Sequence, residues 1–132
     1  MGVVTAWEEL RRNPDARMVD VRTKAEWSFV GIPDLAKAGK EVDLVEWQSF
    51  PTMEQNGAFV EEVSARIADK SSPVYLLCRS GARSRSAAMA LTAAGYETCF
   101  NVRGGFEGPH DGEKHRGTTE GWKAQGLPWV QG

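Results

Sequence analysis

The 132-residue sequence predicts an α/β fold with an open, mainly parallel five-stranded sheet flanked by helices. Strand-like and helix-like patterns alternate along the chain, which is typical of parallel sheets built from strand–helix–strand units. Val74–Leu77 is an uninterrupted apolar run, as expected for a strand that is buried on both faces. Phe59, Val63 and Ile67 recur at four-residue spacing among charged residues, which indicates an amphipathic helix.

The other elements are assigned from capping residues and apolar runs. Thr5 and Glu8 have the spacing of a capping box, and Pro14 ends the helix that they open. The amphipathic helix is expected to end near Lys70, because a Ser-Ser-Pro sequence follows it. A helical turn is expected at residues 23–27, and further strands at residues 18–21, 41–47 and 98–102.

The functional interpretation depends on residues 74–95. The buried strand predicted there leads into Cys78, and Ser84 can cap a helix that stops at Gly95. A strand, a tight loop and a helix N-terminus direct backbone N–H groups at one point. Such a point stabilises a thiolate or a bound anion.

The composition of this loop favours a reactive Cys78. Arg79 and Arg83 carry positive charge that persists near neutral pH. Three small residues between these arginines allow the loop to form an anion-binding nest: Ser80, Gly81 and Ala82. The alternative is a buried cysteine that only fills space. We predict that Cys78 is an ionised nucleophile.

Three stretches of the sequence resemble rhodanese-type sulfurtransferases. Residues 78–84 (CRSGARS) resemble the active-site loop of this family, whose pattern is C-R-x-G-x-R-S/T. Residues 20–23 (DVRT) and 102–105 (VRGG) resemble its N-terminal and C-terminal signatures. The three signatures occur in the expected order and span nearly the whole chain.

The resemblance implies a sulfurtransferase that moves a sulfane sulfur from a donor such as thiosulfate to a thiol or cyanide through a Cys78 persulfide. It implies no metal and no organic cofactor. The partners would be a small anionic sulfur donor and a thiol or protein-cysteine acceptor. Asp20 and Arg22 would have a supporting role, in which Asp20 pairs with an arginine. The implied substrate-binding residues are Arg79, Ser80, Gly81, Ala82, Arg83 and Ser84.

Two alternatives remain open. A thiolate in an amide nest also suits the tetrahedral oxyanion of a cysteine-dependent phosphatase or an arsenate reductase. Cysteine phosphatases of the related fold use C-x5-R, however, and that pattern places Ser84 where the arginine would be needed. The second alternative is a non-catalytic rhodanese-type binding module. Such members often lack the cysteine that this chain retains.

Composition and cysteine content restrict the class of protein. A net charge of −2 and a pI near 5.7 disfavour nucleic acid as a partner. We expect no membrane span, because no apolar run is long enough, and no signal peptide. Two cysteines do not make a disulfide framework, so we expect a cytoplasmic protein. The length predicts a single domain over residues 1–132. Cys99 is interpreted as a core thiol, with a resolving partner for Cys78 as the alternative.

Residues 108–121 (GPHDGEKHRGTTEG) depart from the family pattern. In that pattern a tryptophan closely follows the paired glycines, whereas here Trp122 comes much later, so we predict a loop insertion. We expect this loop to act as a lid or a docking segment for a partner. The spacing of His110, Asp111 and His115 does not support a metal site.

Overall fold

The computed structural model describes residues 2–49, 52, 54–79, 81–108 and 121–131 and confirms the α/β fold. All pairings within its main sheet are parallel. Four strands form this sheet among the described residues, one fewer than predicted, and a single parallel bridge joins Gly2 to Arg103. The strands lie in the order β3 (Asp43–Leu44), β1 (Arg17–Asp20), β6 (Val74–Leu77) and β7 (Cys99–Asn101).

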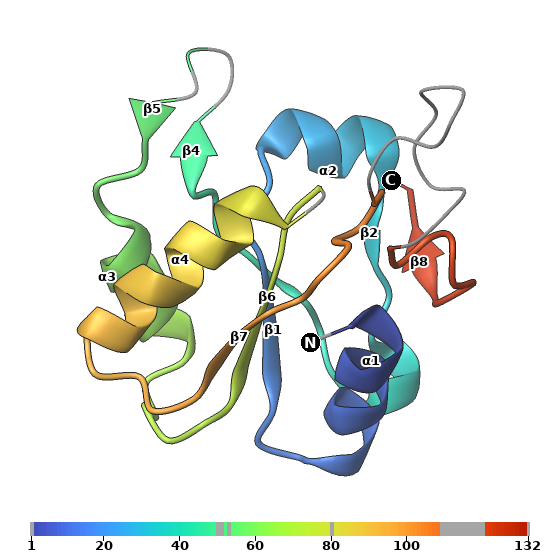
Figure 1. The fold of residues 1–132 in the computed structure, drawn as a ribbon, viewed down its shortest axis with the longest axis horizontal. Coiled ribbons are helices and arrows are strands. Elements are labelled where there is room, and N and C mark those ends of the chain that lie inside the picture. The colour runs from blue at the N-terminus through green and yellow to red at the C-terminus, as the bar shows by residue number, and fades with distance from the viewer. Residues whose placement is uncertain (1, 50–51, 53, 80, 109–120, 132) are drawn as a thin grey trace.

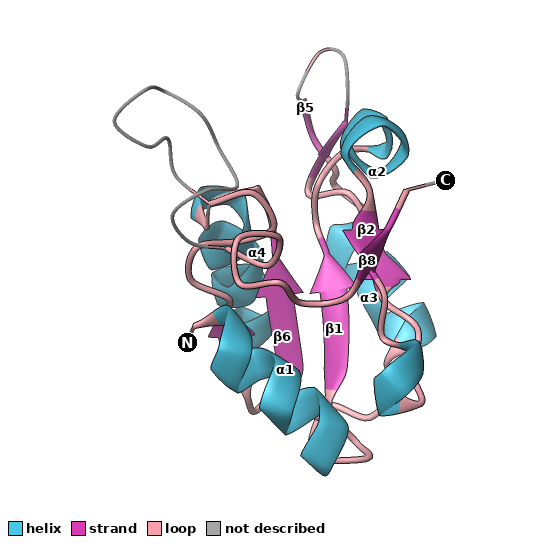
Figure 2. Ribbon diagram, turned by 90° about the vertical axis from the view of Figure 1, so that its right-hand side faces the viewer, coloured by secondary structure: helices cyan, strands magenta, loops and turns pink. Residues whose placement is uncertain are grey.

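Helices cover both faces of the sheet. Figure 1 shows α3 and α4 together on one side of the strands and α1 on the other, and in Figure 2 α1 crosses in front of β1 and β6. The helices are α1 (Val3–Arg12), α2 (Lys24–Val30), α3 (Phe59–Arg66) and α4 (Ala82–Ala93), with a short 3-10 helix at Ala36–Ala38. Two small antiparallel pairs complete the elements: β2 (Ile32–Pro33) with β8 (Trp129–Val130), and β4 (Gln48–Ser49) with β5 (Glu54–Gln55).

The apolar core has two parts, because successive residues of a strand point to opposite faces. In β6, Val74 and Leu76 pack in the cluster that includes α3 and α4, whereas Tyr75 and Leu77 pack in the cluster that includes α1. All four residues are buried, as the apolar run predicts. None of the helices within the described ranges is long and apolar enough to cross a membrane.

Several predicted boundaries are wrong. The first helix begins at Val3, and Gly2 precedes it without a side-chain cap, so Thr5 does not open a capping box. Val3 belongs to the buried face of this helix, which explains the earlier start. Ser84 is not a cap either, because α4 begins at Ala82 after Gly81, whose φ of +121° suits a residue without a Cβ.

Other boundaries differ from the prediction as well, and α2 is longer than the helical turn expected at residues 23–27. The amphipathic helix ends at Arg66 rather than near Lys70. The predicted stop of α4 at Gly95 is confirmed, because Ala94 is its C-cap and Gly95 follows with a φ of +104°. The strand predicted at residues 41–47 is limited to Asp43–Leu44.

Candidate active site

The sheet brings the predicted loop to a converging edge. Asp20 lies opposite Leu77, and Leu76 lies opposite Asn101, so β1, β6 and β7 end close together. Cys78 follows β6, which lies between β1 and β7 in the sheet. The carboxyl edge of parallel strands is where ligands bind in open α/β sheets. The loop that carries Cys78 therefore lies where the carboxyl ends of three parallel strands meet.

The Cys78 thiol lies at the N-terminus of α4. The residue is 1% exposed, and the Gly81 N–H donates to its Sγ at 3.0 Å. The Ser84 hydroxyl lies 3.3 Å from the same sulfur, and the Ser84 side chain is buried. Ser80 lies outside the described residues. Gly81 and Ser84 therefore meet Cys78 as the sequence predicts.

The segment after β7 fixes the start of this loop. The N–H of Phe106 donates to the Cys78 carbonyl at 2.8 Å, and the N–H groups of Glu107 and Gly108 donate to the Arg79 carbonyl at 3.0 and 3.1 Å. Gly105 has a φ of +66°, and a Cβ there would lie 2.5 Å from the Cys78 carbonyl oxygen. The paired glycines of the VRGG sequence thus allow close backbone approach to the cysteine.

A buried ion pair supports the same segment. The Asp20 and Arg22 side chains are fully buried, with 2.7 Å between Arg22 Nη2 and Asp20 Oδ2. Arg22 Nη2 also donates to the Gly31 carbonyl at 2.6 Å, and the guanidinium lies 4.2 Å from the centre of the Phe106 ring. The prediction that Asp20 pairs with an arginine is confirmed. This pair holds Phe106, whose N–H binds the Cys78 backbone.

A second ion pair was not predicted from the sequence. Arg83 donates to both carboxylate oxygens of Glu26, with distances of 2.6 and 2.9 Å. Glu26 is also fixed by a reciprocal capping box with Thr23 at the start of α2. The Thr-x-x-Glu spacing could have indicated this cap, whereas nothing in the sequence indicates the contact with Arg83.

This pair changes the ionisation of both partners. Burial opposes the charge on Glu26, but the hydrogen bond and charge of Arg83 hold the pKa of Glu26 below its ordinary value. Burial likewise opposes the charge on Arg83, but Glu26 raises the pKa of Arg83, with smaller contributions from Cys78 and Asp20. The guanidinium therefore stays charged beside the loop while a carboxylate binds it.

Three further residues complete the surroundings. Arg79 and Ala82 are exposed at the loop. Asn101, at the end of β7, accepts a hydrogen bond from the Ser84 hydroxyl at 2.5 Å. Sequence reasoning missed Asn101, because its distance in the chain from Ser84 gives no signal.

Cys99 lies on β7 as a half-buried free thiol. Burial raises the pKa of Cys99, partly offset by a hydrogen bond to Thr92. Its packing against the apolar cluster that includes α3 and α4 agrees with a core thiol.

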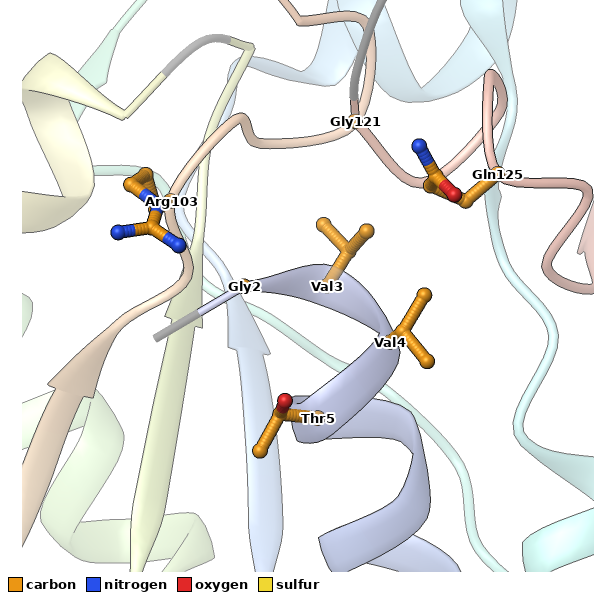
Figure 3. A pocket seen from close by; sticks show the side chains of 7 residues that line it. All are labelled: Gly2, Val3, Val4, Thr5, Arg103, Gly121 and Gln125. Carbon is orange, nitrogen blue, oxygen red and sulfur yellow. The ribbon is translucent and has the colours of Figure 1, made fainter.

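The structure also contains hollows away from Cys78, and one of about 510 Å³ has Cys99 and Asn101 in its lining. A hollow of about 180 Å³ lies beside the start of α1 and has no cysteine in its lining. Figure 3 shows Val3 and Val4 between Arg103 and Gln125 in this hollow. No cluster of potential metal ligands occurs in the described part of the chain. The predicted 108–121 insertion lies outside the described residues except for its terminal glycines, and so do His110, Asp111 and His115.

Comparison with known proteins identifies the family of this chain. The family described as the STR4 middle domain matches residues 1–132. A crystal structure of Rv0390 from M. tuberculosis has a TM-score of 0.92 and 49% identity, and the match covers 100% of this chain and 96% of that one. The chain therefore belongs to the STR4 middle domain family, and its resemblance to rhodanese-type proteins is confirmed.

Relatives known from sequence include proteins with and without a described activity. An uncharacterized protein of Rickettsia conorii, RC0915, is 40% identical over 124 residues, which are 94% of this chain and 90% of that protein. The thiosulfate sulfurtransferase GlpE of Actinobacillus pleuropneumoniae is 28% identical over 123 residues, which are 93% of this chain and 84% of that protein.

Proposed function

We propose that this protein is a sulfurtransferase that moves a sulfane sulfur from a donor such as thiosulfate to a thiol or cyanide through a persulfide on Cys78. The supporting observation is the Cys78 sulfur at the N-terminus of α4, where the Gly81 N–H donates to it at 3.0 Å. The helix dipole and this donor favour negative charge on the sulfur and on an approaching anion. The similarity to GlpE supports the same class of reaction.

The reaction proceeds in two covalent steps. The Cys78 thiolate attacks the outer sulfur of thiosulfate, a new S–S bond forms, and the old S–S bond breaks as sulfite leaves with the electron pair. An acceptor thiolate or cyanide then attacks the outer sulfur of the Cys78 persulfide. The S–S bond to Cys78 breaks, and the thiolate is regenerated. Neither step requires a metal or an organic cofactor.

The loop supplies the proposed contacts to the donor. Arg79, the exposed residue that follows Cys78, attracts the small anion. Arg83, whose guanidinium is held by Glu26, adds positive charge at the start of α4. The acceptor is a small thiol or a protein cysteine, in keeping with a reducing cytoplasm. The proposed substrate-binding residues are Arg79, Ser80, Gly81, Ala82, Arg83 and Ser84.

Steady-state kinetics with thiosulfate and cyanide test this proposal. Covalent transfer predicts parallel lines in double-reciprocal plots, because the first product leaves before the acceptor binds. Cys78→Ser should abolish the activity, whereas the matched control Cys99→Ser should retain it. Intersecting lines, or activity that survives in Cys78→Ser, would contradict transfer through Cys78.

A further inference from the structure

The Ser84 hydroxyl has more acceptors around it than it can serve at once. Its Oγ lies 3.3 Å from Cys78 Sγ, 3.2 Å from the Gly81 carbonyl oxygen and 2.5 Å from Asn101 Oδ1. A hydroxyl has one hydrogen to donate. The Asn101 oxygen is the nearest of the three acceptors, so the hydrogen lies on the Ser84–Asn101 contact.

This assignment changes which hydrogen bonds are open to the sulfur. When Ser84 donates to Asn101, its oxygen presents lone pairs to Cys78, and a thiol S–H donates to them. A thiolate has no hydrogen to donate, so Ser84 can hydrogen-bond to it only if its hydroxyl turns from Asn101 to the sulfur. The hydrogen bonds of the thiol state therefore run from Cys78 through Ser84 to Asn101. In the thiolate state, Asn101 Oδ1 loses its Ser84 donor.

We propose that Asn101 is a positioning residue that, through Ser84, stabilises Cys78 as the neutral thiol and opposes its ionisation. The inference rests on the proposed function in taking Cys78 as the nucleophile. In the activation step the S–H bond breaks, and water takes the proton. The Ser84 hydroxyl then rotates about its Cβ–Oγ bond and donates to the sulfur, so no other covalent bond changes.

The position of Asn101 suits this role. It ends β7, beside β6, and pairs in register with Leu76, two residues before Cys78. A hydrogen-bonded strand holds it more firmly than a loop would, so Oδ1 remains at a fixed place relative to Ser84.

The surrounding charges stay the same when Asn101 or Ser84 is replaced by a neutral residue. Besides Glu107 in the segment after β7, the charged groups on the elements around Cys78 come from β1 and its extension, from α2, from the loop and from the first turn of α4. Two of these charges form one buried pair, and two more form the pair between α2 and α4. These groups are Asp20, Arg22, Glu26, Arg79, Arg83 and Arg85.

Thiolate ultraviolet absorbance, measured across pH, tests the proposal. The signal of each variant is corrected with the same variant carrying Cys78→Ser, which removes the contribution of Cys99. Asn101→Leu should move the appearance of the Cys78 thiolate to lower pH by about one pH unit, because Ser84 is then free to donate to sulfur. Ser84→Ala should move it to higher pH. The double variant should behave like Ser84→Ala, since Asn101 acts through Ser84.

A second variant keeps the test decisive if Asn101→Leu does not fold. Asn101→Asp preserves shape, accepts the Ser84 hydrogen more strongly and adds negative charge, so the thiolate should appear at higher pH. No shift in Asn101→Leu, a shift to higher pH in that variant, or an undiminished shift without Ser84 would overturn the proposal.

The measurement uses no sulfur donor. Correct shifts in a protein that transfers no sulfur would therefore contradict the proposed function alone. Normal transfer without the shifts would contradict the role of Asn101 alone.

Discussion

Asp20 and Arg22 place two opposite charges in the core beneath the cysteine loop. Both side chains are fully buried, and Asp20 accepts from Arg22 Nε and Nη2 and from the Arg22 backbone N–H. A buried pair adds little net stability, but removal of one partner leaves an uncompensated charge. The stability of the protein should therefore be sensitive to substitution of either Asp20 or Arg22.

Asp20→Asn should lower the free energy of unfolding by about 3 kcal/mol or more, because Arg22 then remains buried without its carboxylate. Urea unfolding measures this loss. Asp43→Asn is the matched control, since Asp43 pairs with Arg17, whose side chain is 35% exposed. The control should lose about 1 kcal/mol or less. Equal losses in both variants would contradict the structural role of the buried pair.

Glu26 gives stability that depends on pH. The pKa of Glu26 is lowered in the folded state, so its contribution is full above its ordinary pKa of 4.5 and is lost as pH falls through the lower folded value. Glu26→Gln should therefore be less stable than the wild type at neutral pH, by about 1 kcal/mol. The difference should vanish in acid. Chemical unfolding at several pH values measures it, and a difference that is independent of pH would exclude this cause.

Residue types predicted the local contacts of Cys78 better than they predicted the contacts made by residues distant in the chain. Cys78, Gly81 and Ser84 lie within one loop and its helix, so their spacing fixes their proximity. Glu26 is 57 positions from Arg83, and Asn101 is 17 from Ser84. Those contacts depend on how α2 and β7 pack, which single-sequence patterns do not specify.

At the scale of elements, the Gly104-Gly105 turn after β7 is the contact that restrains the loop. The chain passes so close to Cys78 and Arg79 that a side chain at Gly105 would overlap their backbone. The turn also places Phe106 against Arg22. The turn after β7 and the buried Arg22 thus support the cysteine loop together.

Gly105→Ala should lower the stability of the protein by more than the cost of placing an alanine in the left-handed conformation. Gly126 has a similar φ of +70°, against +66° for Gly105, but no atom lies within 4 Å of a Cβ there. Gly126→Ala should therefore cost about 1–2 kcal/mol, the cost of the conformation alone. Gly105→Ala should cost more and should also reduce sulfur transfer. Thermal unfolding and activity measure both effects, and the idea fails if the two alanine variants behave alike.

The apolar run predicted β6 with both of its ends, whereas α3 was predicted correctly in kind but not at its C-terminal end. The apolar run of β6 and the four-residue spacing of α3 report burial directly, so both elements were identified. Strands of two residues, such as β2 and β4, are too short to show a period. The N-terminus of α1 is set by the burial of Val3 rather than by a polar cap, so the Thr5–Glu8 pattern misled the prediction.

Over the whole molecule, the parallel order β3-β1-β6-β7 turns separate sequence signatures into one site. The signature after β1 supplies the ion pair, the one after β6 supplies the thiol, and the one after β7 supplies the backbone support. Alternation of strands and helices was enough to predict a mainly parallel sheet, and parallel strands end at the same edge, where these signatures converge. The number of strands could not be obtained in this way, since it depends on pairing at the sheet edges.

The mass of the intact protein after brief incubation with thiosulfate is the most direct test of sulfur transfer through Cys78. The wild type should gain one sulfur atom, cyanide should remove it, and the folded Cys78→Ser variant should gain none. An unchanged mass in the folded wild type, or an equal gain in Cys78→Ser, would contradict a Cys78 persulfide formed from thiosulfate.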